Sequence, residues 1–144
     1  DEPQLVPAEA GVGMQLLASR GDEGAIGAAD GGLPGLGLIP GRVSHLRDQG
    51  CELRVPHVGW NAIASTSVAD PLLSGIPDGT DFYFVHSYGF VADDQTDVLA
   101  TTDYGIPVTA AVRRGHVWGT QFHPEKSSKA GAQLLRNFIV GHGC

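Results

Sequence analysis

Apolar and polar positions follow different patterns along this chain of 144 residues, and each pattern predicts its own kind of structure. The apolar residues at 14–17 open a short helical pattern over 14–20, which needs packing against a neighbour to be stable. Gly or Pro then recurs every few positions over 21–42, as is typical of loops. Aromatic and β-branched residues follow and predict strands in five runs, at 51–60, 81–90, 96–102, 107–114 and 116–122.

The carboxyl end of the chain carries the most complete helical pattern. Ser127 or Ser128 can cap this helix and Gly141 can end it. Its apolar stripe consists of Ala130, Leu134, Leu135, Phe138 and Ile139. The order of helix, several strands and helix predicts an α/β or α+β domain in which helices cover a sheet. Residues 1–12 do not fit the βαβ units with which a doubly wound sheet normally opens.

Composition narrows the possible classes of function. Hydrophobic residues make up 42% of the chain and charged residues 17%, which suits one soluble globular domain. The net charge is −7 and no basic stripe is present, so we do not expect a nucleic-acid partner. No apolar run approaches the roughly 18 residues of a membrane span, and residues 1–12 lack the pattern of a signal peptide. The two cysteines make no disulfide framework, so we expect a cytoplasmic protein.

Candidate chemistry lies in the segment GTQFHPEKSS, where His123 and Glu125 are two residues apart. On an extended backbone these two side chains face the same side, and Pro124 between them stiffens the pair. A histidine whose ring is oriented by a carboxylate supplies the base and the orienting group of a catalytic triad. The alternative is an ordinary surface His and Glu at the end of a strand.

The residues His86, Ser87 and Tyr88 form a second polar cluster inside an aromatic run. They can belong to a binding site, or they can hydrogen-bond their own loop. The six histidines lack metal-ligand spacing, so no metal site is expected. The glycines of 35–41 neither follow a predicted strand nor precede a helix, which argues against phosphate binding. Cys51 is expected to be a small buried apolar residue.

Together these segments resemble the class I, or triad, glutamine amidotransferases. The matching motifs are GMQLL at 13–17, GLGLIPGRV at 35–43, VPHVGWN at 55–61, FYFVHSYGF at 82–90 and QFHPEKS at 121–127. PHVGWN and FYFVHSY are similar to the glutaminase subunits of imidazole glycerol phosphate synthase in particular. The resemblance covers residues 13 to 140. It implies a divergent segment at 1–12, followed at 13–144 by a partial amidotransferase domain with a central mixed or parallel sheet, flanking helices and missing N-terminal strands.

The resemblance also implies roles for single residues. His123 would be the general base and Glu125 its orienting carboxylate. The substrate L-glutamine would be bound by Gln15, His86, Ser87 and Tyr88. The side chains of Trp60, Tyr83 and Lys126 would face a (βα)8-barrel cyclase, which uses the released ammonia in histidine biosynthesis. No cofactor and no metal are implied.

Two departures from the family pattern G-x-C-x-G-M-Q affect the expected activity. The nucleophilic Cys corresponds to position 11, which is Gly11 here, and glycine carries no thiol. Pro3, Pro7 and Glu9 stand where the family has a buried strand, and a central strand does not tolerate them. The sequence therefore predicts a glutaminase-subunit homologue with impaired catalysis. A binding-only pseudoenzyme that docks on the cyclase and a glutaminase of another class I pathway are the alternatives.

Overall fold

A computed structural model describes residues 4–6, 15–18, 39–67 and 69–141 of the chain. Its strands are β1 (Gln4–Val6), β2 (Gln15–Ala18), β3 (Gly41–His45), β4 (His57–Ser65), β5 (Asp81–His86), β6 (Tyr88–Ala92), β7 (Val98–Asp103), β8 (Pro107–Arg114) and β9 (Val117–Thr120). Short 3-10 helices occur at η2 (Leu46–Gln49), η3 (Pro71–Leu73), η4 (Gln95–Asp97) and η5 (Pro124–Lys126). The α-helix of the described residues, α1, covers Ser128–Gly141.

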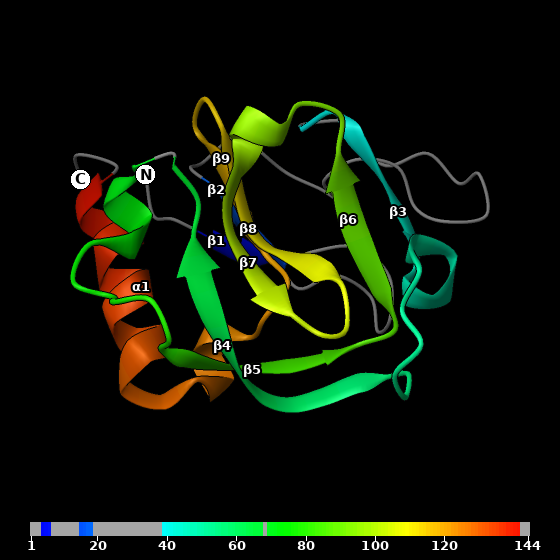
Figure 1. Ribbon diagram of the computed structural model, residues 1–144. Helices are drawn as coiled ribbons and strands as arrows, with labels where there is room; N and C mark the ends of the chain where they lie inside the picture. Colours follow the sequence, from blue (N-terminus) through cyan, green and yellow to red (C-terminus); the bar gives the residue numbers. More distant parts are fainter. Residues whose placement is uncertain (1–3, 7–14, 19–38, 68, 142–144) are drawn as a thin grey trace.

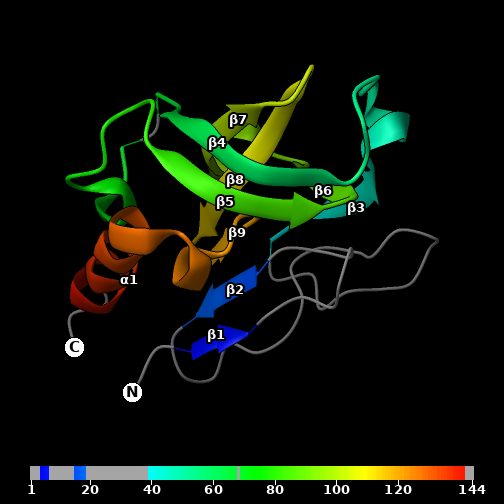
Figure 2. The ribbon, with the colours of Figure 1, turned by 90° about the horizontal axis from the view of Figure 1, so that it is seen from below.

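The strands form one large sheet and one small sheet. The large sheet has the order β1-β2-β9-β8-β7-β4-β5, and β3 pairs with β6 separately. Helix α1 and the β3–β6 pair lie at opposite ends of the curled large sheet (Figure 1). Seen from below, β1 and β2 continue the sheet beyond β9 (Figure 2). The predicted combination of a sheet with helices is therefore confirmed.

The ladders between the described strands are all antiparallel, unlike the mixed or parallel sheet that the resemblance implies. At β7–β8 and β8–β9 the short connections favour this arrangement, because an antiparallel pair can be joined by a tight turn whereas a parallel pair needs a long crossover. The turn between β8 and β9 shows this at Gly115, whose φ of +61° favours glycine. No parallel ladder occurs among these described strands.

Several predicted elements change at their ends or in kind. The helix expected over 14–20 is wrong at 15–18, where β2 pairs with β1 and β9 instead. So short an apolar run cannot nucleate a helix by itself, whereas pairing with β9 gives its backbone hydrogen-bond partners. The run 51–60 is a strand only from His57 onward, and the run 81–90 divides at Ser87 into β5 and β6. The strand predicted at 107–114 is confirmed as β8.

The main core lies between the large sheet and α1. Its largest fully buried side chains, Phe82, Phe84 and Phe122, come from β5 and from the segment after β9. Leu134 and Phe138 of α1 are buried in this core, and Ala130 and Leu135 pack against it. Four of the five residues of the predicted stripe therefore contact the core, and the fifth, Ile139, is exposed. Cys51 is buried as expected, although it lies outside a strand.

Asp70 fastens the segment between β4 and β5 to the large sheet. Its Oδ2 accepts a hydrogen bond from Nη1 of Arg113 at 2.7 Å, and its Oδ1 accepts one from the N–H of Leu72 at 2.9 Å. Nε1 of Trp118 donates to the same Oδ1 at 3.3 Å, and the Arg113 guanidinium lies 4.3 Å from the Trp118 ring centroid. One buried carboxylate therefore caps η3 and joins it to β8 and β9.

Candidate active site

His123 and Glu125 lie together where the chain leaves β9. Nδ1 of His123 is 3.3 Å from Oε2 of Glu125, so the two side chains are within hydrogen-bonding reach. The reason differs from the one expected, because Glu125 lies in the 3-10 turn η5 and not on an extended strand. The His123 side chain is 23% exposed and that of Glu125 is 43% exposed. The pair can thus exchange protons with a ligand or with water.

The free edge of β5 holds this pair in place. The N–H of His123 donates to the carbonyl of Tyr83 at 3.0 Å. Oγ of Ser127 accepts a hydrogen bond from the N–H of Tyr83 at 3.0 Å and donates one to the carbonyl of His123 at 2.7 Å. The side chain of Ser127, considered above as a helix cap, is buried and bridges η5 to the sheet. This contribution of Ser127 to the site could not be predicted from its position before a helix.

Helix α1 packs closely behind η5. The structure has room for glycine alone at position 131, since a Cβ there would lie 1.9 Å from the carbonyl oxygen of Pro124. The N–H of Gly131 also donates to the carbonyl of Ser127 at 3.1 Å. The backbone that carries Glu125 is therefore supported by the sheet on one side and by the helix on the other.

The segment from His86 to Gly89 is fixed through three consecutive carbonyl groups. Nδ1 of His86 lies 2.8 Å from the carbonyl oxygen of Tyr88, and the N–H of Leu46 donates to the carbonyl of Ser87 at 3.0 Å. Nε2 of Gln49 donates to the carbonyl of Gly89 at 3.0 Å. The alternative considered above, that this cluster bonds its own loop, accounts for one of these contacts. The other two come from η2.

His86 is also electrostatically connected to the His123–Glu125 pair. Burial lowers the pKa of His86, the hydrogen bond to the Tyr88 carbonyl opposes this shift, and the nearby charge of His123 lowers the pKa further. The geometry agrees, because the N–H of His123 bonds the carbonyl of Tyr83, three residues before His86 on β5. A neutral ring at His86 and an accessible imidazole at His123 suit different tasks, the first structural and the second proton transfer.

Two of the predicted site positions lie in the N-terminal part of the chain. Gln15 is in β2 and pairs with Thr120 at the end of β9, three residues before His123. Gly11 lies outside the described residues. The backbone therefore brings Gln15 to the same end of β9 as the pair, and the interaction of its side chain with glutamine stays a prediction.

Two of the three predicted partner-facing residues, Trp60 and Tyr83, lie on the outer face of β4 and β5. Trp60 and Tyr83 are cross-strand neighbours with ring centroids 5.9 Å apart, and Val58 pairs with Val85 beside them. We call Val58, Trp60, Tyr83 and Val85 the outer strip. The Trp60 side chain is 55% exposed, which is unusual for so large an apolar group. Lys126 is exposed on η5, directly after Glu125.

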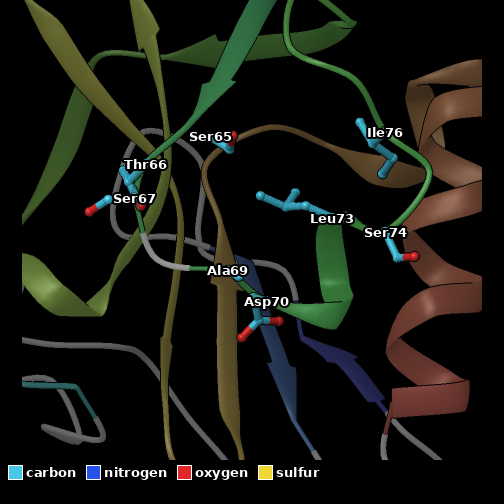
Figure 3. Close-up of a pocket in the computed structure, with 8 residues that line it drawn as sticks. All are labelled: Ser65, Thr66, Ser67, Ala69, Asp70, Leu73, Ser74 and Ile76. Carbon is cyan, nitrogen blue, oxygen red and sulfur yellow. The ribbon is translucent and has the colours of Figure 1, made fainter.

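The structure also shows features away from this site. A pocket of about 280 Å³ lies between the end of β4 and η3 (Figure 3). It is lined by Ser65, Thr66, Ser67, Ala69, Asp70, Leu73, Ser74 and Ile76, and it contains no predicted site residue. Within the described ranges, no three His, Cys, Asp or Glu side chains are arranged to hold a metal ion. Over the same ranges, no helix has the length and apolar character needed to span a bilayer.

Comparison with known proteins decides the family. The profile of class I glutamine amidotransferases matches residues 12–141, which is most of the chain. The chain belongs to this family. It is 48% identical over 135 residues to imidazole glycerol phosphate synthase subunit HisH 1 of Prochlorococcus marinus, covering 92% of this chain and 61% of the relative. It is 44% identical over 129 residues to subunit HisH of Acinetobacter baylyi, covering 89% of this chain and 59% of the relative.

The amidotransferase chain thus spans about three fifths of the length of these relatives. Among solved structures, it is similar to a putative GMP synthase protein from Thermoplasma acidophilum, with a TM-score of 0.54 and 18% identity. That match covers 69% of this chain and 47% of the solved chain. At this identity the likeness concerns the fold alone, and it agrees with the amidotransferase assignment.

Proposed function

We propose that this chain is a glutaminase-subunit homologue of imidazole glycerol phosphate synthase that binds L-glutamine but hydrolyses it poorly. The contact between His123 and Glu125 carries the proposal, since it supplies a base with its orienting group beside the segment at His86–Tyr88. The similarity to subunits named HisH supports the choice of this pathway. The amidotransferase domain would occupy 13–144, after a divergent segment at 1–12.

The reaction proposed for the family explains the expected impairment. A thiolate attacks the carboxamide carbon of glutamine, the histidine delivers a proton to the leaving ammonia, and water then releases glutamate. Gly11 stands at the position of the thiol and offers no electron pair. Loss of a triad nucleophile costs on the order of 10⁶-fold in turnover in a well-studied protease.

The outer strip is the proposed docking surface for the (βα)8-barrel cyclase. Val58, Trp60 and Val85 are exposed apolar side chains, and Lys126 adds an exposed positive charge on η5. Aromatic residues with large exposed area are typical anchors of protein interfaces. This surface also supports the second candidate, a pseudoenzyme that docks on the cyclase without binding glutamine.

Measurement of ammonia release separates these candidates. The unmodified chain with a cyclase partner should release no ammonia from glutamine above background, while calorimetry should detect glutamine binding. The variant Gly11→Cys should gain ammonia release, and the further change His123→Ala should abolish that gain. Ammonia release by the unmodified chain at a normal family rate would refute the proposed impairment. Cyclase binding without glutamine binding would favour the pseudoenzyme.

A further inference from the structure

A buried pair of histidines lies on the inner face of β4 and β5, behind the outer strip. His57 and His86 are direct partners in the β4–β5 ladder, and each is only 3% exposed. Nδ1 of His57 is 2.9 Å from Nε2 of His86. The ring of His57 stacks on those of Phe84 and Tyr104, with centroids 4.9 and 4.0 Å away. The proposed glutaminase reaction assigns no role to His57.

The orientation of Asn61 sets the direction of hydrogen bonding at one end of this pair. Nδ2 of Asn61 donates to the carbonyl of Asp103 at 2.8 Å, and its Oδ1 accepts from the N–H of Ala62 at 2.9 Å. These two backbone partners leave one possible orientation for the amide. Nδ2 is also 3.2 Å from Nε2 of His57. Nε2 of His57 must therefore be an acceptor, which places the proton of its neutral ring on Nδ1.

The carbonyl of Tyr88 sets the same direction at the other end. A carbonyl oxygen can only accept, so Nδ1 of His86, 2.8 Å away, carries a proton. Nε2 of the neutral His86 ring is then an acceptor, and it faces the donating Nδ1 of His57. Donors run from Asn61 through His57 and His86 to Tyr88. Every ring nitrogen of the two histidines is satisfied once.

Removal of the middle donor would disturb the far end of this chain of hydrogen bonds. Without His57, Nε2 of His86 would be a buried acceptor with no donor, which is costly. The Tyr88 carbonyl would still hold the His86 proton on Nδ1, so the His86 ring could satisfy Nε2 only by turning toward another donor, such as water. Such a turn would weaken the 2.8 Å contact between Nδ1 and the Tyr88 carbonyl oxygen, so the peptide group of Tyr88 would shift. Burial keeps His57 neutral at pH 7, since it lowers the pKa of His57 to about 4.

We propose that His57 is a positioning residue for the glutamine-binding segment, because its Nδ1–H holds the ring of His86 in the orientation that fixes the carbonyl of Tyr88. The proposal rests on the proposed binding of glutamine at His86–Tyr88. Such supporting groups hold a site within the small tolerances that binding needs.

Nitrogen NMR of the imidazole rings tests the proposal directly. In the unmodified chain at pH 7.5, both His57 and His86 should carry the proton on Nδ1, whereas isolated neutral histidines favour Nε2. In His57→Phe, which keeps a flat ring beside Phe84 and Tyr104 but removes the donor, the His86 proton should stay on Nδ1 while the carbonyl carbon shift of Tyr88 changes. The affinity for L-glutamine, measured by calorimetry, should fall about tenfold.

The matched variant is His57→Asn, in which the amide nitrogen stands in for Nδ1 while the stacked ring is lost. It should keep the carbonyl carbon shift of Tyr88 and keep glutamine affinity within about threefold of the original. The proposal is overturned if the unmodified His57 carries its proton on Nε2, or if His57→Phe leaves the carbonyl carbon shift of Tyr88 unchanged. Equal loss of affinity in both variants with an unchanged Tyr88 carbonyl carbon shift would assign His57 to packing instead.

Failure of the glutamine site itself would look different. An unmodified chain that does not bind millimolar L-glutamine would refute the proposed pocket. The carbonyl carbon shift of Tyr88, compared among the unmodified chain, His57→Phe and His57→Asn, would still decide whether His57 positions this segment. If His57→Phe does not fold, His57→Leu, which also lacks the donor, replaces it in this comparison.

Discussion

Acidification should destabilise this protein through His57 well above the pH at which carboxylates titrate. His57 has its pKa lowered by burial, and secondarily by the charge of His86, from the ordinary 6.5 to about 4. Between pH 6.5 and about 4, His57 binds a proton in the unfolded chain but stays neutral in the folded chain. Stability from this residue is therefore complete above pH 6.5 and declines as the pH falls toward 4.

The magnitude follows from the width of this window. One pKa unit corresponds to about 1.36 kcal/mol, so a window of about 2.5 units is worth roughly 3 kcal/mol. His86 acts in the same direction, because burial also lowers its pKa. Asp97 opposes them, because burial raises the pKa of its carboxyl and the folded state holds that proton more tightly. The carboxyl pKa values of Asp78 and Asp94 are lowered, so their losses begin only near pH 4 and below.

Urea unfolding at pH 7.5, 6.5, 5.5 and 4.5 measures how steeply the free energy of unfolding falls with pH. The free energy of unfolding should fall by about 1.4 kcal/mol per pH unit more in the unmodified chain than in His57→Phe below pH 6.5. His116→Phe is the matched control, since His116 is exposed, and it should keep the full slope. Equal slopes in the unmodified chain and His57→Phe would refute the assignment of the window to His57.

Three further changes have separable outcomes. Asp70→Ala removes the acceptor shared by Leu72, Arg113 and Trp118 and should lower the free energy of unfolding in urea by about 2–4 kcal/mol. Asp70→Asn should recover part of that loss. A loss below about 1 kcal/mol in Asp70→Ala would contradict the role given to this carboxylate. Ser127→Ala should lower the free energy of unfolding by about 1–3 kcal/mol and speed hydrogen exchange of the Tyr83 amide. An unchanged exchange rate would argue against the bridge that Ser127 forms between Tyr83 and His123. Trp60→Ala should weaken cyclase binding tenfold or more with little effect on unfolding, whereas Val140→Ala, also exposed, should leave binding unchanged.

Local pattern was a good guide where an element depends on its own residues. The β-branched run at 107–114 predicts β8 with its bounds, and the apolar stripe after Ser128 predicts α1. The spacing of His123 and Glu125 predicts a pair within hydrogen-bonding reach, although a 3-10 turn and not a strand brings them together. The apolar pattern at 15–18 is misleading, because four residues are too few to distinguish a helix from a strand. Pairing with the edge of β9 makes this segment a strand.

The chemical groups that are present, and the absence of a thiol at Gly11, follow from the sequence alone, because they depend only on which side chains the chain contains. How those groups are held depends on the fold of the whole chain. Ser127 bonds Tyr83 at the edge of β5, although the two residues are 44 positions apart in the chain. His57 bonds His86 on the neighbouring strand, although these two are 29 positions apart. Such contacts depend on strand register, which sets every cross-strand pair at once and is fixed by packing of the whole sheet. The hydrogen-bond direction from Asn61 to Tyr88 exists only in that register.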